Sequence, residues 1–281
     1  MTYVTRFAPS PSGPLHIGHA FSALTAFARA QSRGGRFLLR IEDIDIARCT
    51  PAYEQAIYDD LSWLGLTWPH PVMRQSDRMP VYRAALDELV SLNLCYPCNC
   101  TRSDIRTALS APQEGAPIQG PDGLVYPGTC RARRMSGAGP RDSIRLNMAA
   151  ALDHLHGDLC FSETGPLHPG LHSLGAGLVG AVGDIVLARR DIGTSYHLSV
   201  VVDDAAQGIT EVVRGVDLFE ATQIHVVLQG LLRLPQVTYH HHDLIRDEAG
   251  KRLAKRDDAR AISHFRSAGF SPADIRQMIG L

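Results

Sequence analysis

The chain has 281 residues, a formal net charge of −1 at pH 7 and a hydrophobic fraction of 44%, which indicate one large or two modest domains with a buried core. It has no apolar run of about 18 residues, and its first residues lack the regions of a signal peptide. These observations argue against a membrane or secreted protein. We expect a cytoplasmic enzyme that is a monomer and has no membrane partner.

Lysine is almost absent from the chain. Of its 28 basic residues only Lys251 and Lys255 are lysines, and both fall in one loop-like stretch. A general preference for arginine explains this composition wherever arginine serves equally well. Arginine does not replace lysine where a compact ammonium on a flexible stem is needed. One of the two lysines is therefore a candidate for a chemically required residue.

The first third of the chain alternates between strand and helix patterns. In order, the predicted elements are a strand (3–8), a turn rich in Pro and Gly (9–14), a helix (15–31), a strand (36–41) and two amphipathic helices (51–65 and 80–94). This alternation predicts an α/β fold with a parallel sheet and crossover helices.

The remaining chain is less regular. Residues 95–140 hold four of the six cysteines and many Gly and Pro residues, which predicts a small inserted module, and the Gly-rich residues 165–183 are expected to form a loop. Further predicted elements are strands at 185–188 and 197–203, a helix at 218–232 and two short helices within 261–281.

A candidate anion site lies where the Pro- and Gly-rich turn meets the first helix. Free backbone N–H groups and the helix dipole favour a phosphate there. His16 and His19 are three residues apart and share one helical face, and Gly18 allows a close approach to the backbone. The pattern predicts a phosphate-binding site with two imidazoles.

Four segments in chain order resemble the class I glutamyl-tRNA synthetases: RFAPSPSGPLHIGH at 6–19, LRIEDID at 39–45, VVDD and GITEVVRG within 201–215, and RLAKR at 252–256. The resemblance implies a Rossmann-like class I aminoacyl-tRNA synthetase catalytic domain with a parallel sheet. It divides the chain into the first half of this domain (1–94), a small zinc-binding insertion (95–140), the second half with an acceptor-type insertion (141–245), and the ATP loop with a short helical C-terminal end (246–281).

In this family an amino-acid carboxylate attacks the α-phosphate of ATP, which is used with Mg²⁺. Such transfers depend on positioning and on stabilisation of the developing negative charge. The resemblance implies that His16, His19 and Lys255 act in catalysis. It implies ATP contacts from Pro9, His16, Gly18, His19, Arg252 and Lys255. The family's mobile loop has Lys and Ser where this chain has Arg252 and Ala254, so Lys255 is the lysine that we expect to be required.

The amino-acid pocket needs cations for the two carboxylates of L-glutamate and an acid for its ammonium. Arginine grips a carboxylate with two parallel hydrogen bonds. By resemblance, the residues expected to bind glutamate are Arg6, Phe7, Ala8, Pro9, Ser10, Glu42, Tyr196 and Arg214. From spacing alone, Arg6 and Glu42 could equally be an ordinary pair on neighbouring strands, and Tyr196 a core residue.

The cysteine module allows two sets of zinc ligands. Structural zinc takes four ligands, mostly thiolate or imidazole, and counting cysteines alone selects Cys95, Cys98, Cys100 and Cys130. The resemblance instead implies Cys98, Cys100, Tyr126 and Cys130, with the tyrosine hydroxyl as an unusual ligand. A module that binds no metal is the third possibility.

The chain ends roughly two dozen residues after the ATP loop, and Val200 stands where full-length glutamyl-tRNA synthetases usually have Asn. Both features resemble the short paralogues of the family, which lack the anticodon-binding domain. This implies transfer of glutamate to the queuosine base of tRNA(Asp), with ATP, L-glutamate and that tRNA as partners. The alternatives are a truncated synthetase that charges a tRNA 3′ end, and a paralogue that binds tRNA without catalysis.

Overall fold

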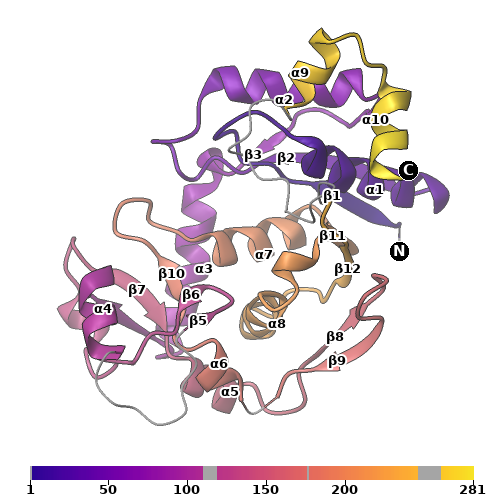
Figure 1. The fold of residues 1–281 in the computed structure, drawn as a ribbon. Coiled ribbons are helices and arrows are strands. Elements are labelled where there is room, and N and C mark those ends of the chain that lie inside the picture. The colour runs from indigo at the N-terminus through magenta and orange to yellow at the C-terminus, as the bar shows by residue number, and fades with distance from the viewer. Residues whose placement is uncertain (1, 110–118, 176, 246–260) are drawn as a thin grey trace.

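A computed structural model describes residues 2–109, 119–175, 177–245 and 261–281, and Figure 1 shows the arrangement of its elements. The chain begins with strand β1 (Val4–Phe7), helix α1 (Ile17–Ser32) and strand β2 (Arg36–Ile41). Strand β2 pairs in parallel with β1 on one side and with the short strand β3 (Met73–Arg74) on the other. The expected strand, helix and parallel strand at the start of the chain are confirmed.

A second sheet continues the first. Its strands follow the order β11 (Glu211–Gly215), β12 (Thr238–His242), β8 (Cys160–Glu163) and β9 (Gly170–Ser173), and only β9 is antiparallel to its neighbour. Strand β11 adjoins β1, because Val4 N donates to Thr210 Oγ1 at 2.9 Å and Thr210 N donates to Val4 O at 3.0 Å. The carboxyl ends of β1, β2 and β11 therefore meet at one edge, where ligands bind in open α/β sheets.

Helices cover this sheet and enclose two main apolar clusters. Alanines on the inner face of α1 let it approach the sheet closely, and that cluster also holds residues of β2, of α2 (Pro51–Trp63) and of the C-terminal helices. The second cluster joins α3 (Met79–Ser91), α7 (Tyr196–Ala206) and α8 (Thr222–Leu231). None of the helices in the described parts of the chain is long and apolar enough to cross a bilayer.

The inserted module has its own sheet. Strand β4 (Cys95–Cys98) is antiparallel to β7 (Ser143–Leu146), which pairs with β10 (Val186–Ala188). These strands lie beside α4 and the β5–β6 hairpin in Figure 1. The smaller elements of this part are α4 (Arg102–Leu109), β5 (Gln119–Gly120), β6 (Gly123–Leu124), α5 (Met148–His154) and α6 (Leu178–Ala181). Strands β7 and β10 lie beyond residue 140, so this sheet extends past the range 95–140.

The C-terminal end consists of two short helices, as expected. They are α9 (Ile262–Ser267) and α10 (Pro272–Ile279), which begins at a capping box in which Ser271 Oγ accepts from Asp274 N at 3.3 Å. Ile275 and Ile279 of α10 are buried in the α1 cluster. The amphipathic face of α10 is thus used to cover the α1 side of the first sheet.

Two local predictions are wrong. Residues 197–203, expected as a strand, belong to α7, which Ser195 caps by accepting from Leu198 N. This helix is buried on nearly every side, and a continuous apolar run does not distinguish such a helix from a buried strand. The expected loop at 165–183 instead contains strand β9 and helix α6. Strand β9 forms because it pairs antiparallel with β8, a contact that its own Gly-rich sequence does not reveal.

Candidate active site

Two histidines form the cap of helix α1. His16 is the N-cap residue, and its Nδ1 accepts from Gly18 N at 3.1 Å, while His19 Nδ1 accepts from His16 N at 3.1 Å. The two rings stack with centroids 3.8 Å apart. A Cβ on Gly18 would lie 3.0 Å from His16 Cε1, so glycine is what allows the ring to fold over the first turn.

This cap fixes the tautomer of both rings. Each Nδ1 accepts a backbone hydrogen bond, so a neutral ring carries its proton on Nε2. The cap therefore uses Nδ1 of each imidazole to hold the helix, and in a neutral ring Nε2–H is the hydrogen-bond donor. His16 and His19 both line a cavity beside the cap, where such donors suit phosphate oxygens.

The cavity beside this cap has a volume of about 420 Å³. Its walls come from the carboxyl ends of β1, β2 and β11, from the start of α1 and from the start of α7. Nine of the residues expected to bind glutamate or ATP line it: Arg6, Phe7, Ala8, His16, Gly18, His19, Glu42, Tyr196 and Arg214.

Two predicted residues lie outside the cavity wall. The carbonyl of Pro9 accepts from Glu42 N at 3.0 Å, so Pro9 acts on the cavity by holding Glu42 in place. Ser10 Oγ lies 3.7 Å from Cys49 Sγ. Arg252 and Lys255, the two predicted ATP-loop residues, lie outside the described part of the chain.

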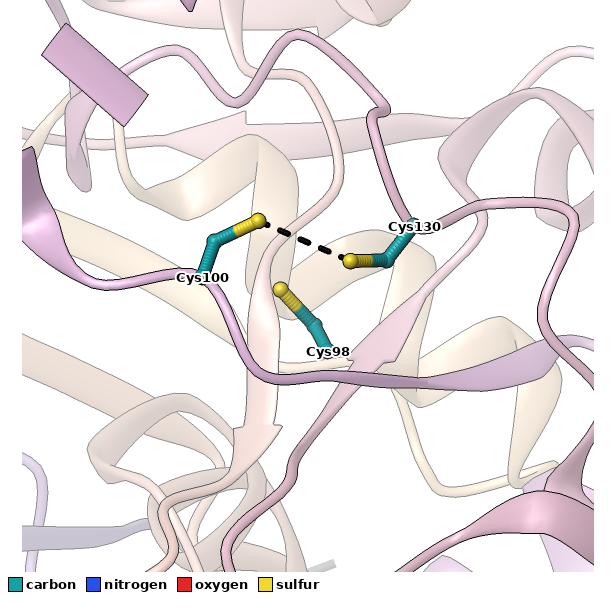
Figure 2. Close-up of side chains that lie close together, drawn as sticks. All are labelled: Cys98, Cys100 and Cys130. Atoms are coloured by element: carbon teal, nitrogen blue, oxygen red, sulfur yellow. Dashed lines mark hydrogen bonds between the residues drawn. The ribbon is translucent and has the colours of Figure 1, made fainter. Parts of the chain in front are cut away.

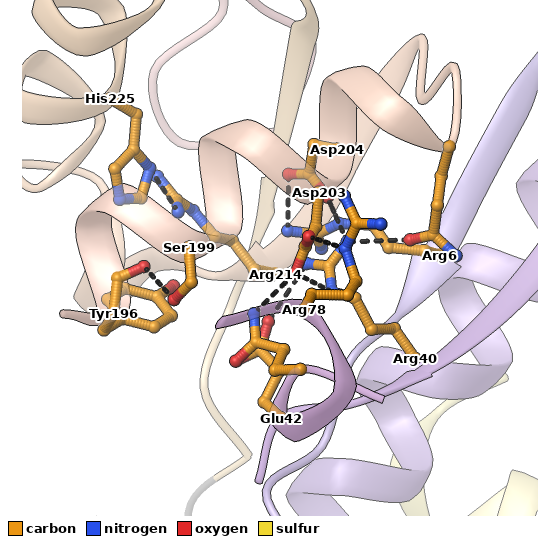
Figure 3. A network of polar contacts seen from close by, with 12 residues as sticks. Arg6, Arg40, Glu42, Arg78, Tyr196, Ser199, Asp203, Asp204, Arg214 and His225 are labelled. Carbon is orange, nitrogen blue, oxygen red and sulfur yellow. Dashed lines mark hydrogen bonds and ion pairs between the residues drawn. The ribbon is translucent and has the colours of Figure 1, made fainter. Parts of the chain in front are cut away.

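Arg6 belongs to a buried charge network (Figure 3). Its Nε and Nη2 lie 3.0 and 3.2 Å from the two carboxylate oxygens of Asp204. Arg40 donates to Asp204 at 2.7 Å and to Glu42 at 3.0 Å, and Arg78 lies 2.6 Å from Asp203. Three arginines thus face three carboxylates, which is how charges this deeply buried are stabilised.

The pKa values in this network follow from burial and pairing. Burial alone raises the pKa of Asp204, but Arg6 and Arg40 outweigh it and hold that pKa below its usual value. Burial raises the pKa of Glu42, and the partly opposing charges of Arg40 and Arg6 do not reverse it. A substrate ammonium beside Glu42 would therefore find a carboxylate that gains from a further positive neighbour.

Arg214 is equally buried, at 6% exposure, but its partners are neutral. Its Nε lies 3.0 Å from His241 Nε2 and its Nη1 lies 3.0 Å from His225 Nδ1. Its Nη2 donates to Thr222 Oγ1 at 2.7 Å and to Leu218 O at 3.3 Å. No carboxylate of the described residues forms an ion pair with Arg214. It is an oriented cation on the cavity wall whose charge is not cancelled by any carboxylate in the described part of the chain.

The three module cysteines Cys98, Cys100 and Cys130 converge (Figure 2). Their sulfur atoms lie within 4.8 Å of one another, so the group can hold a metal ion. The hydroxyl of Tyr126 lies 3.3 Å from Cys98 Sγ and 3.4 Å from Cys100 Sγ, and it accepts from Cys130 N at 2.9 Å. Cys95 is not part of this group, and burial raises the pKa of its thiol to about 12.

Sequence reasoning missed several residues that shape the cavity. Asp204 stood within a recognised motif but was given no role, although it pairs with both Arg6 and Arg40. An acidic pair inside an apolar run was the signal that could have marked it. His225 and His241 carried no such signal, because their contacts with Arg214 are made only in the folded chain.

The fold and the cavity agree with one class of enzyme. The family described as "tRNA synthetases class I (E and Q), catalytic domain" matches residues 2–281, and the chain belongs to this family. The predicted resemblance, the α/β fold class and the parallel sheet are thereby confirmed.

Particular relatives sharpen this assignment. The chain is 61% identical over 99% of its length, and 100% of the relative's, to a protein of Rhodobacter capsulatus named glutamyl-Q tRNA(Asp) synthetase. It is 41% identical over 92% of its length, and 79% of the relative's, to a protein of that name from Thiobacillus denitrificans.

A solved structure has the same fold. It is a glutamate tRNA ligase from Elizabethkingia meningosepticum in complex with its amino acid, with a TM-score of 0.72 and 25% identity. The match covers 96% of this chain and 54% of that ligase, so the chain spans about half the length of the ligase.

Proposed function

We propose that the protein uses ATP to activate L-glutamate and transfers the glutamyl group to the queuosine base of tRNA(Asp). In the first step the α-carboxylate bonds to the α-phosphorus of ATP, used with Mg²⁺, and pyrophosphate leaves. In the second step a queuosine hydroxyl attacks the activated carbonyl, an ester forms and AMP leaves. The observation that carries the proposal is the cation Arg214, which no carboxylate of residues 2–109, 119–175, 177–245 and 261–281 pairs with, in a cavity shared with His16 and His19.

The cavity offers one group for each charge of glutamate. Arg214 has the charge to attract the side-chain carboxylate in a buried place, where such a pair is strong, and one Nη1–H beside those bonded to protein partners can donate to it. Glu42 lies on the same wall as a partner for the ammonium. Arg6 lines the cavity too, but the carboxylate of Asp204 already cancels its charge, which leaves it the smaller share of carboxylate binding.

The histidine cap serves the nucleotide. The backbone bonds at Nδ1 fix the direction of the Nε2–H groups of His16 and His19, and oriented donors of this kind stabilise charge that develops on phosphate oxygens. Gly18 keeps the backbone of the first turn open to a phosphate or a flat ring. Arg252 and Lys255 are proposed to add positive charge from the ATP loop.

The metal of the cysteine module is proposed to be a single structural zinc ion, held by Cys98, Cys100, Tyr126 and Cys130. Tetrahedral sulfur ligands about 2.3 Å from zinc lie about 3.8 Å apart. The 3.5 Å between Cys100 Sγ and Cys130 Sγ and the 3.3–3.4 Å from Tyr126 OH to its two thiols are close to that requirement. Burial raises the pKa of Cys130, but hydrogen bonds from Tyr126 and Cys100 bring it down to about 7, which favours a thiolate.

The first experiment measures exchange of pyrophosphate into ATP with glutamate and without tRNA. We expect exchange that depends on glutamate; its absence would favour a paralogue that only binds tRNA. The second compares transfer of labelled glutamate to tRNA(Asp) with and without queuosine. Equal labelling of the two tRNAs would overturn the queuosine assignment and favour charging of a 3′ end.

We propose that the enzyme is a monomer located in the cytoplasm.

The required lysine is tested by Lys255→Arg, which keeps the charge and changes the shape of the cation. We expect slower glutamate-dependent exchange, because arginine does not reproduce a compact ammonium on a flexible stem. Lys251→Arg is the matched control and should leave exchange unchanged. If Lys255→Arg is fully active, the lysine is only a remnant of the composition.

A further inference from the structure

Arg214 is connected to a chain of side chains that leads away from the cavity. Its Nη1 lies 3.0 Å from His225 Nδ1, and the opposite nitrogen of that ring, Nε2, lies 3.1 Å from His197 Nδ1. His197 Nε2 in turn lies 3.1 Å from Asp122 Oδ1. The chain runs from α8, which carries His225, through α7, which carries His197, to the β5–β6 turn.

The direction of each hydrogen bond follows from the cation at one end. A guanidinium only donates, so His225 accepts at Nδ1 and, as a neutral ring, carries its proton on Nε2. That proton is donated to His197 Nδ1, which leaves the proton of His197 on Nε2, facing Asp122. Burial and the nearby charge of Arg214 lower the pKa of His225 well below its usual value, so this ring stays neutral. All three bonds point from the cation to the carboxylate.

The chain of bonds joins two cavities. Arg214 lines the cavity described above, whereas His197 and Asp122 line a second cavity of about 730 Å³. His225 and His197 are 2% and 6% exposed, but the side chain of Asp122 is 41% exposed. The two imidazoles are therefore buried in the interior, whereas Asp122 can be mutated without disturbing the packing of the core.

We propose that His225, His197 and Asp122 are positioning residues that hold the Arg214 guanidinium in the orientation that meets the side-chain carboxylate of glutamate. This inference rests on the proposed function, since it assigns that carboxylate to Arg214. Aligned hydrogen bonds in a low-dielectric interior strengthen one another. Because both imidazoles are neutral, they orient the guanidinium without cancelling its charge, as a directly bound carboxylate would. Loss of a member releases Arg214 and weakens glutamate binding, while the ATP site is unaffected.

Pyrophosphate exchange with glutamate and ATP varied separately tests this role. In His225→Leu both hydrogen bonds of the ring are lost, and we expect the KM for glutamate to rise at least about tenfold, which corresponds to one hydrogen bond to a charged group. The KM for ATP should stay the same. His225→Asn, whose amide both accepts and donates, should restore most of the glutamate affinity.

A change at the exposed end provides a variant that leaves the core intact. Asp122→Ala should raise the KM for glutamate by a smaller factor, about threefold, because it acts through two rings. Asp191→Ala is the matched control. Asp191 is an acid on the wall of the same cavity, but it pairs with Arg189 and not with His197. An unchanged KM for glutamate in His225→Leu, or an equal rise for glutamate and ATP, would overturn the positioning role.

A second measurement examines the hydrogen bonds between Arg214, His225, His197 and Asp122 and does not depend on catalysis. The nitrogen NMR shifts of the imidazole rings report their tautomers, and we expect a protonated Nε2 and a bare Nδ1 in both His197 and His225. The opposite tautomer in either ring overturns the inference even in an inactive variant. Failure of the proposed function has a different signature, since wild-type protein would then show no glutamate-dependent exchange at all.

Discussion

The two buried arginines of the amino-acid cavity, Arg6 and Arg214, differ in what surrounds their charge. Arg6 makes a two-pronged ion pair with Asp204, inside a network that balances three arginines with three carboxylates. Arg214 is as deeply buried, yet among the described residues it bonds only to neutral side chains and a carbonyl. The Arg6 charge holds strands and helices together, and the Arg214 charge is the one that we propose meets a ligand.

This difference has a cost that points to function. A buried cation without a counter-charge is expensive unless its hydrogen bonds are satisfied. His225 and His241 satisfy hydrogen bonds of Arg214. The carboxylate of Glu163 in turn holds His241, because it accepts from the Nδ1–H and from the backbone N–H of that histidine. The described residues thus supply the hydrogen bonds of Arg214 but no carboxylate to pair with it, which an anionic substrate can then provide.

The largest expected effect follows from removing the uncancelled charge. Arg214→Gln should lower kcat/KM for glutamate by at least about 100-fold, because truncating one partner of a buried charge pair costs roughly 2–5 kcal/mol. The free energy of unfolding should fall by only about 1–2 kcal/mol, since no anion among the described residues loses its partner. Pyrophosphate exchange and urea unfolding measure the two quantities. A large loss of stability would show that Arg214, like Arg6, holds the fold.

The opposite outcome is expected at Asp204. Asp204→Asn leaves both Arg6 and Arg40 short of their shared anion, and breaking such a buried network costs about 3–5 kcal/mol of stability. Urea unfolding of this variant beside Arg214→Gln gives a direct comparison. Similar stabilities for the two variants would break the distinction between a structural and a ligand-binding arginine.

The cysteine group has the opposite charge requirement to Arg214. Arg214 is a cation that needs an anion, whereas thiolates of the cysteine group are anions that need a cation. Cys98→Ser, or chelation of the metal, should lower the unfolding temperature by roughly 5–10 °C and abolish a content of about one zinc per chain. Cys95→Ala is the matched control, since that thiol lies outside the group, and it should keep its zinc. Loss of zinc from Cys95→Ala would contradict the ligand set with Tyr126.

The smallest expected effect concerns the buried acid Asp60. Neither of its carboxylate oxygens has a hydrogen bond, although Arg266 Nη1 lies 3.3 Å from Asp60 Oδ1. Burial raises its pKa from 3.8 to about 6, against the charge of Arg266. A raised pKa means that the protonated acid favours the fold below pH 4, and this contribution is lost as the pH rises through 6. Between pH 4 and 7 the wild type should lose about 1–3 kcal/mol relative to Asp60→Asn. Parallel stability profiles for the two proteins would exclude this titration.

The sequence predicted those parts of the molecule whose signals are local or belong to a motif. The turn before α1, the strands β1 and β2, and the two short C-terminal helices depend on local patterns, and all were predicted. Helix α7 and strand β9 were not, because the first is buried on nearly every side and the second depends on pairing with β8. Motif resemblance named nine of the residues that line the cavity.

The partners of the two arginines were beyond such reasoning. Asp204 meets Arg6 across 198 positions of sequence, and His241 meets Arg214 across 27. Spacing along the chain carries no information about contacts of this kind. The sequence therefore indicated which arginines line the cavity, and only the folded chain distinguishes the paired arginine from the uncancelled one.

The most direct test of this distinction is the choice between glutamate and glutamine, which differ in the charge of one group. We expect wild-type protein to support pyrophosphate exchange with glutamate and at least about 100-fold more weakly with glutamine, and Arg214→Gln to lose this preference. Equal use of the two amino acids by the wild type, or an unchanged preference in Arg214→Gln, would contradict the claim that Arg214 is the charge kept for the substrate.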